Sequence, residues 1–267
     1  MIKLIAIDLD GTLLHTDKTI SLTNIEAINY ARSKGVKVVI CTGRPYLGTK
    51  DFAEQIGFDD DDEYLIVFNG SQVRKANSGE ILVDETVDTQ DLKRWYEETE
   101  RLSLPLNPID SDWVYDPPYY PGGNDSTYET PAPRKTIDFA EFEEGHKFNK
   151  FVICTTEEIL TAKRPSIDAD LFTDYQVVLS HPHQLEVGKK DVNKGNALKQ
   201  LGEILNIKME EMMTIGDQNN DQTMIDMAGI GVAMGNAVDN ILQSADYITD
   251  TNDNDGVAKA IYHYIKD

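Results

Sequence analysis

The sequence predicts an α/β protein, in which a doubly wound parallel-sheet domain is interrupted by an inserted α+β domain. Short apolar strands alternate with helical segments in both terminal parts of the 267-residue chain, as they do in parallel sheets. Between residues 84 and 188 helices and strands are mixed without that rhythm, which is typical of an α+β domain. We therefore expect a discontinuous core domain at 1–83 and 189–267 and an inserted domain at 84–188.

The first predicted strand is an apolar run that begins at Leu4 and leads directly into Asp8-Leu9-Asp10-Gly11-Thr12. Such a run is typical of a strand that is buried on both faces. Carboxylates that follow it are costly to desolvate unless a cation compensates them, and Mg²⁺ takes oxygen ligands of this kind. Gly11 lets the backbone turn so that both carboxylates converge at the sheet edge where ligands bind. The alternative interpretation is an acidic turn without function.

Helical and strand patterns then alternate as far as residue 83. Ser21 or Thr23 can cap a helix that has apolar residues at helical spacing and ends at Gly35. The buried strand 36–41 follows, and this βαβ unit implies parallel strands with a right-handed crossover. Further expected elements are a helix from Pro45 to about Gly57, a strand at 64–68, and a hairpin of 71–73 with 81–83.

The inserted region and the last part of the chain give two different patterns. For the insertion we expect a helix at 89–102, a Pro- and Tyr-rich segment at 116–123, and strands at 147–154, 175–180 and 184–187. The βα rhythm returns at Asn193. There we expect a helix through Leu205, a strand at 212–215, a helix at 222–227, a strand at 230–234, a helix at 237–243, a strand at 246–249 and a helix at 255–265.

The composition limits the classes of partner. Acidic residues outnumber basic ones by 47 to 25, which gives a formal net charge of −22. This charge repels nucleic acid and anionic membranes, so we expect neither as a partner. We do not expect residues 1–7 to act as a signal peptide, because this stretch is short and charge follows it quickly, and no apolar run reaches membrane-spanning length. Cys41 and Cys154 are predicted to be buried thiols in a reducing compartment, and we expect a cytoplasmic protein.

Polar side chains directly follow three of the predicted parallel strands. Asp8 and Asp10 follow the first strand, Thr42 follows the second, and Asp217 follows the strand at 212–215. Parallel strands bring these ends to one edge of the sheet, so we expect the side chains to lie close together. Lys194 begins a helix, where a cation is poorly placed for the helix dipole unless an anion binds there.

These residues resemble the motifs of the haloacid dehalogenase (HAD) superfamily, and the insertion resembles the large cap of its Cof-type hydrolases. Four motifs stand in the family's order: Asp8-Leu9-Asp10-Gly11-Thr12, Thr42-Gly43-Arg44, Lys194, and Gly216-Asp217-Gln218-Asn219-Asn220-Asp221. The resemblance covers essentially the whole chain. It implies a Rossmann-like core and the Mg²⁺-dependent hydrolysis of a small phosphorylated metabolite, often a sugar phosphate.

The resemblance also implies a role for each motif position. Asp8 would be the nucleophile and Asp10 the general acid/base. Mg²⁺ would be held by Asp8, by Asp10 through its backbone carbonyl, and by Asp217. The residues expected to bind the substrate phosphate are Leu9 through its backbone N–H, Thr42, Gly43, Lys194 and Asn220.

The proposed chemistry explains why these residue types are needed. Mg²⁺ removes the repulsion between an anionic phosphomonoester and the attacking carboxylate. Asp8 would form an aspartyl-phosphate, which splits one difficult displacement into two easier ones. Asp10 would protonate the leaving alkoxide and then deprotonate the attacking water, a contribution typically worth ~10²–10⁴-fold in rate.

Other functions of the same core remain open at this point. A phosphomutase would return the phosphate from Asp8 to another hydroxyl group. A phosphate-sensing or partner-binding protein would keep the pocket without turnover, although it would not need Asp10. A response-regulator receiver also uses aspartates, Thr and Lys on a parallel sheet, but it is far shorter than this chain.

For several of these residues, a purely structural role is an alternative to the functional one. Thr42 could cap the helix at Pro45, and Lys194 could be solvated. We expect Asp221 to orient Lys194 or Asn220 rather than to bind metal. Arg44 could reach the substrate or pair on the surface. The plausible substrate contacts of the insertion, each of which could instead be a core or surface residue, are Trp113, Tyr115, Tyr119, Tyr120, His181 and His183.

Overall fold

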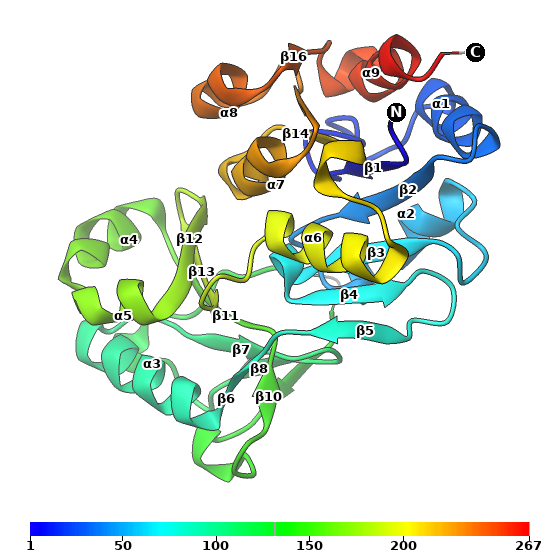
Figure 1. The fold of residues 1–267 in the computed structure, drawn as a ribbon. Helices are drawn as coiled ribbons and strands as arrows, with labels where there is room; N and C mark the ends of the chain where they lie inside the picture. The colour runs from blue at the N-terminus through cyan, green and yellow to red at the C-terminus, as the bar shows by residue number, and fades with distance from the viewer. Residues whose placement is uncertain (131, 267) are drawn as a thin grey trace. The chain divides into compact units, whose positions relative to one another are not determined.

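The computed structural model describes residues 1–130 and 132–266 (Figure 1). The chain divides into two compact units: unit 1 is Met1–Val83 with Asn193–Asp267, and unit 2 is Asp84–Val192. The second division falls later than the expected position after residue 188 because strand β13 (Gln184–Lys189) extends beyond that point.

Unit 1 is built on one eight-stranded sheet in the order β16-β15-β14-β1-β2-β3-β4-β5. Its strands are β1 (Leu4–Ile7), β2 (Lys37–Cys41), β3 (Tyr64–Val67), β4 (Gln72–Lys75), β5 (Ile81–Asp84), β14 (Met212–Gly216), β15 (Ile230–Ala233) and β16 (Tyr247–Ile248). From β16 to β3 every neighbouring pair is parallel, whereas β3 and β4 are antiparallel. The predicted α/β fold with a parallel-sheet core is therefore confirmed.

Helices cover this sheet, and α6 lies across one of its faces (Figure 1). The helices of unit 1 are α1 (Leu22–Ser33), α2 (Lys50–Gln55), α6 (Lys194–Leu205), α7 (Gln222–Met227), α8 (Asp239–Ser244) and α9 (Gly256–Tyr264). Leu198 and Leu201 of α6 pack on Leu4 and Ala6 of β1 in one buried apolar cluster. Because side chains alternate along a strand, the buried Ile5 points to the opposite face.

The starts of α1 and α2 show how local chemistry determines where a helix begins. Ser21, rather than Thr23, caps α1, and its hydroxyl oxygen accepts the backbone N–H of Asn24 at 3.0 Å. The expected continuous helix from Pro45 is wrong. Pro45 has an extended ψ of 159° and precedes a short 3₁₀ turn, so the α-helix begins only at Lys50.

The register of the central strands places the expected polar residues at one level of the sheet. Ile7 at the end of β1 pairs with Ile40 of β2 and with Ile215 of β14. The residues that follow these strands therefore leave the sheet at the same edge. This edge carries the candidate site.

Unit 2 contains a six-stranded sheet in the order β12-β13-β11-β7-β8-β9 and a two-stranded sheet of β10 and β6. Its remaining strands are β6 (Val87–Asp88), β7 (Asn107–Ile109), β8 (Val114–Asp116), β9 (Arg134–Thr136), β10 (Lys147–Phe148), β11 (Lys150–Cys154) and β12 (Tyr175–His181). Helices α3 (Thr89–Leu102), α4 (Glu157–Lys163) and α5 (Ala169–Asp174) contribute to its apolar core with Trp95, Leu160 and Leu171. The single strand expected at 147–154 is wrong, because β10 and β11 belong to different sheets.

The cysteines and most of the singled-out aromatic residues have ordinary structural positions. Cys41 and Cys154 are buried free thiols, as predicted. Tyr115 belongs to the core of unit 2, whereas Trp113 and Tyr119 are exposed. His181 and His183 stack on each other with ring centroids 5.5 Å apart. Among the described residues, no helix is both long enough and apolar enough to cross a membrane.

Candidate active site

A buried lysine lies at the centre of the site. The Lys194 side chain is 0% exposed, and its Nζ donates to Oδ1 of Asp8 and to Oδ1 of Asp221, each at 2.6 Å. Burial works to lower the pKa of Lys194, but the charges of Asp221 and Asp8 outweigh it and raise the pKa. Lys194 is therefore a buried cation, and the alternative of a solvated residue at a helix start is wrong.

Asp221 positions other parts of the site. Its Oδ1 accepts the hydrogen bond from Lys194, and its Oδ2 accepts the backbone N–H groups of Asp217 and Gln218 at 2.9 and 3.0 Å. Both carboxylate oxygens are thus already bonded to protein donors. This geometry agrees with the expectation that Asp221 orients Lys194, and it also fixes the turn that follows β14.

The turn after β1 packs closely against Asp217. The Thr12 hydroxyl donates to Asp217 Oδ1 at 2.8 Å. Gly11 has a φ of +80°, and a Cβ atom there would lie 2.4 Å from Asp217 Oδ2. Only glycine fits this position, because both the left-handed backbone and the close approach exclude a side chain.

The carboxylates of this cluster fit a divalent cation. One oxygen from each of Asp8, Asp217 and Asp221 lies within 4.8 Å of the others, and all three residues are buried. Lys194 compensates only one of the three negative charges. Burial raises the pKa of Asp8 well above its ordinary value, and burial with repulsion from Asp221 raises that of Asp217 to about 7. Uncompensated buried carboxylates of this kind are what a hard cation such as Mg²⁺ stabilises.

Asp10 lies in a different environment from the other aspartates. Arg44 donates to both of its carboxylate oxygens at 2.7 Å, and Lys18 Nζ donates to Oδ1 at 2.8 Å. Burial opposes ionisation of Asp10, but these hydrogen bonds outweigh it and lower its pKa to about 2. The carboxylate is therefore ionised at neutral pH. Because both of its oxygens bind cationic side chains, the backbone carbonyl of Asp10 is better suited to a metal than its carboxylate.

The ends of β2 and β3 bring further polar groups to the same edge. The Thr42 hydroxyl accepts the backbone N–H of Arg44 at 3.2 Å, so it does not cap a helix at Pro45. A Cβ atom on Gly43 would lie 2.8 Å from Oδ1 of Asn69. Asn220 Nδ2 donates to that same Asn69 oxygen at 3.0 Å. Asn69 thus connects two of the residues that were expected to bind phosphate.

Sequence reasoning did not assign a role to Thr12, Lys18 or Asn69. Asn69 follows the predicted strand at 64–68 directly, so the rule that selected Thr42 could have selected it too. Thr12 stands inside the first motif but looks like an ordinary turn residue. Lys18 lies in a polar segment after the first motif, and its side chain reaches Asp10 from a backbone φ of +67°. No pattern in the sequence predicts this contact between Lys18 and Asp10.

Comparison with known protein families identifies the family of this chain. The model of the haloacid dehalogenase-like hydrolases matches residues 5–261. The chain belongs to this family. Among curated relatives, "Putative phosphatase YxeH" of Bacillus subtilis is 34% identical, over 99% of each chain. A second protein of that organism, "5-amino-6-(5-phospho-D-ribitylamino)uracil phosphatase YcsE", is also 34% identical, over 99% of this chain and 96% of its own.

A solved structure extends this comparison to the HAD subclass. The sugar phosphatase BT4131, described as a member of HAD subclass IIB, superposes with a TM-score of 0.78 at 26% identity over 98% of each chain. Subclass IIB corresponds to the Cof-type hydrolases. The predicted superfamily, the predicted fold and the predicted class of phosphoric monoester hydrolase are confirmed. HAD hydrolases generally use a divalent metal, and the Asp cluster of this HAD protein is suited to hold one.

Proposed function

We propose that this chain is a Mg²⁺-dependent phosphatase that hydrolyses a small phosphorylated metabolite through an aspartyl-phosphate on Asp8. The observation that carries the proposal is the buried cluster of Asp8, Asp217 and Asp221 at the carboxyl edge of β1 and β14, in which Lys194 pairs with Asp8 and Asp221. A cation and an anionic substrate would together complete the charge balance of this cluster. We also propose a cytoplasmic location, in line with the two free thiols.

The donor set suggests which atoms would hold Mg²⁺. Lys194 uses Oδ1 of Asp8 and Thr12 uses Oδ1 of Asp217, so the second oxygen of each carboxylate is the one suited to the metal. The backbone carbonyl of Asp10 would be a third ligand. When bound, Mg²⁺ would supply positive charge that offsets the repulsion between Asp8 and the substrate phosphate.

Residues of the chain would carry out the nucleophilic attack and bind the phosphate. Asp8, ionised and held by Lys194, would attack the phosphorus, so that the P–O bond to the leaving alcohol breaks as the bond to Asp8 forms. Lys194, Thr42, Asn220, and the backbone N–H groups of Leu9 and Gly43 would hold the phosphate oxygens. These contacts would orient the phosphate for in-line displacement.

Asp10 would exchange protons on both sides of the intermediate. In its ionised form it can accept a proton from the water that attacks the aspartyl-phosphate. To protonate the leaving alkoxide it must first take up a proton from the solvent. We propose that the bound substrate weakens the contacts of Asp10 with Arg44 and Lys18 and so permits this, since those contacts hold the ionised form.

Phosphate release from a panel of metabolites tests the proposed function. The panel includes hexose phosphates, nucleotides, pyridoxal phosphate, flavin mononucleotide and the ribitylaminouracil phosphate that appears in the name of one relative. We expect release that needs Mg²⁺ and stops with chelator. Release that persists in chelator would contradict the metal requirement, and no release from any compound would contradict the phosphatase. In that case bisphosphates would test the phosphomutase, and phosphate binding would test the non-catalytic protein.

The stabilisation by Mg²⁺ should increase with pH. Without metal, the raised pKa of Asp217, about 7, means that the folded state binds this proton more tightly than the unfolded chain does. The metal-free protein therefore loses stability as pH rises toward 7. Mg²⁺ needs the deprotonated carboxylate, so its binding strengthens over the same range. We expect the melting temperature in Mg²⁺, minus that in chelator, to be larger at about pH 8 than at about pH 5.

Asp217→Asn provides the control for this pH dependence. The asparagine cannot bind this proton, so the variant should show a smaller Mg²⁺ effect and a weaker pH dependence, of which only the part due to Asp8 remains. A wild-type response in the variant would remove Asp217 from the metal site. A pH-independent Mg²⁺ effect in the native chain would contradict the coupling between proton release and metal binding.

A further inference from the structure

Unit 2 contains a polar pocket that shares no residue with the candidate active site. Its volume is about 820 Å³, within the usual range for small-molecule pockets. Strands β8 and β9 lie side by side in parallel, with Val114 opposite Arg134, and they form one wall. The segment 126–130 forms the other wall and is fixed to β11, because the backbone N–H of Thr127 donates to the Cys154 carbonyl at 3.1 Å.

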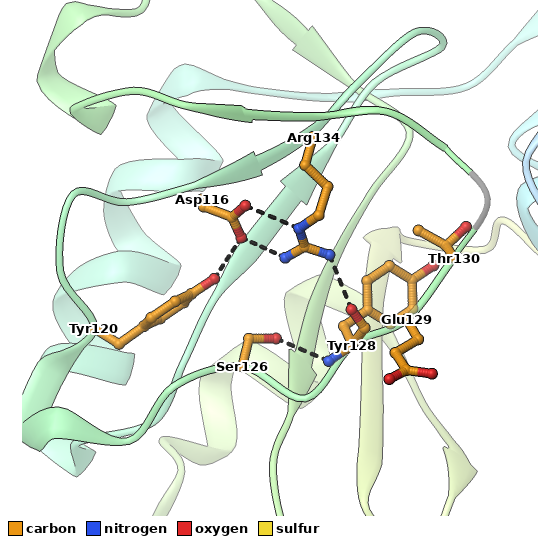
Figure 2. Close-up of a pocket in the computed structure, with 7 residues that line it drawn as sticks. All are labelled: Asp116, Tyr120, Ser126, Tyr128, Glu129, Thr130 and Arg134. Atoms are coloured by element: carbon orange, nitrogen blue, oxygen red, sulfur yellow. Dashed lines mark hydrogen bonds and ion pairs between the residues drawn. The ribbon is translucent and has the colours of Figure 1, made fainter.

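An ion pair lies in this pocket (Figure 2). Arg134 donates from Nε to Asp116 Oδ2 at 2.9 Å and from Nη2 to Asp116 Oδ1. Its Nη1 donates to the Tyr128 carbonyl at 2.9 Å. The guanidinium charge is thus compensated by a carboxylate in a two-bond contact. Such an arginine has little net charge left to attract a phosphate group.

Other side chains hold Asp116 in this pairing. Asn107 Nδ2 donates to Asp116 Oδ1 at 2.8 Å, and the Tyr120 hydroxyl donates to the same oxygen at 2.6 Å. Burial and the nearby Asp116 raise the pKa of Tyr120 to about 12, so its hydroxyl remains a neutral donor. Because Asp116 accepts hydrogen bonds from three side chains, it offers a ligand little further acceptor capacity.

The pocket presents donors to whatever occupies it. Ser126 Oγ accepts the backbone N–H of Tyr128 at 3.2 Å, and Thr130 Oγ1 accepts that of Ala132 at 3.4 Å. Since both oxygens act as acceptors, the hydroxyl hydrogens point elsewhere. A guanidinium has five N–H groups, and Arg134 uses three of them on the described residues. Glu129 adds an exposed negative charge to the lining.

We propose that this pocket binds an uncharged group rich in hydroxyl or carbonyl oxygens and disfavours a phosphate group. Ser126, Thr130 and Arg134 would donate to these oxygens. Repulsion by Glu129, together with the compensated charge of Arg134, would disfavour an anion.

Direct binding of uncharged probes tests the pocket without requiring turnover. D-ribitol, D-glucose and uridine would be titrated into the whole chain, with ligand-observed saturation-transfer NMR as the readout. Ribitol and glucose represent hydroxyl oxygens, and uridine adds ring carbonyls. We expect at least one probe to bind, and the double variant Ser126→Ala with Thr130→Val to weaken it about tenfold. No binding by any probe, or equal binding by the double variant, would overturn the assignment.

Removing the carboxylate that pairs with Arg134 tests whether the pocket excludes phosphate. In Asp116→Asn the guanidinium keeps its charge but loses its compensating carboxylate, so the pocket should then accept an anion. In the same NMR titration, we expect the affinity for D-glucose 6-phosphate relative to that for D-glucose to rise about fivefold. Asp174→Asn is the matched control, because it frees Arg94 from an ion pair elsewhere in unit 2. The same ratio in Asp116→Asn as in the native chain, or an equal rise in the control, would overturn the exclusion.

The two experiments separate the pocket from the phosphatase. If no compound releases phosphate, the proposed function is wrong, and the binding of uncharged probes still decides whether the pocket takes such groups. If phosphate is released but no probe binds, the phosphatase stands and the pocket assignment is wrong.

Discussion

Asp8→Asn is expected to abolish phosphate release while the fold remains intact. The amide has nearly the shape of the carboxylate but cannot serve as an anionic nucleophile. Removal of a catalytic nucleophile commonly lowers kcat by about 10⁴-fold or more. Lys194 would keep its contact with Asp221 at 2.6 Å, so the buried ammonium would not be left without a carboxylate.

The stability of Asp8→Asn distinguishes loss of chemistry from loss of structure. Burial and the charges of Asp221 and Asp217 raise the pKa of Asp8, which means that its ionised form is unfavourable in the metal-free fold. The neutral asparagine should therefore melt at the wild-type temperature or above in chelator. The measurements are phosphate release and thermal unfolding, with Asp250→Asn at an exposed ion pair as the control. Wild-type rates in Asp8→Asn would refute Asp8 as the nucleophile.

The core of the fold could be predicted because its central strands are buried on both faces. Such strands are continuous apolar runs, and β1 and β14 are each buried throughout. The short strands β7 and β9 of unit 2 give no such signal. β7 includes a proline, and β9 is an exposed edge strand of charged and polar residues. Their pairing depends on neighbours that are distant in sequence, which a local pattern does not contain.

The candidate site was predictable where strand ends and known motifs coincide, and less so where long side chains meet. The sequence places Asp8 and Asp217 at one sheet edge, and the structure brings their carboxylates together. The clamp on Asp10 by Arg44 and Lys18 depends on how two long cationic side chains fold back. The role of proton donor predicted from the sequence requires a protonated Asp10, whereas its surroundings in the structure lower its pKa and favour the ionised form.

The second large effect is expected for Lys194→Met, which should lower both stability and activity. Methionine has a similar length but no charge, so Asp8 and Asp221 would face each other in a buried site without their shared cation. Breaking a buried ion pair by removing one partner typically costs about 3–5 kcal/mol. We expect a loss of this size in the free energy of unfolding in chelator, measured by urea denaturation, together with the loss of phosphate release.

A double variant shows whether charge is the cause of this instability. Lys194→Met with Asp221→Asn removes one of the two carboxylates, so it should be more stable than the single variant and still inactive. Lys150→Met is the matched control: it breaks a buried pair with Glu186, 2.9 Å long, in unit 2. The control should lose stability but keep phosphate release per folded molecule. If the double variant were no more stable than Lys194→Met, poor packing of the methionine rather than unpaired charge would explain the effect. The cluster would then contribute less electrostatic energy than its geometry implies.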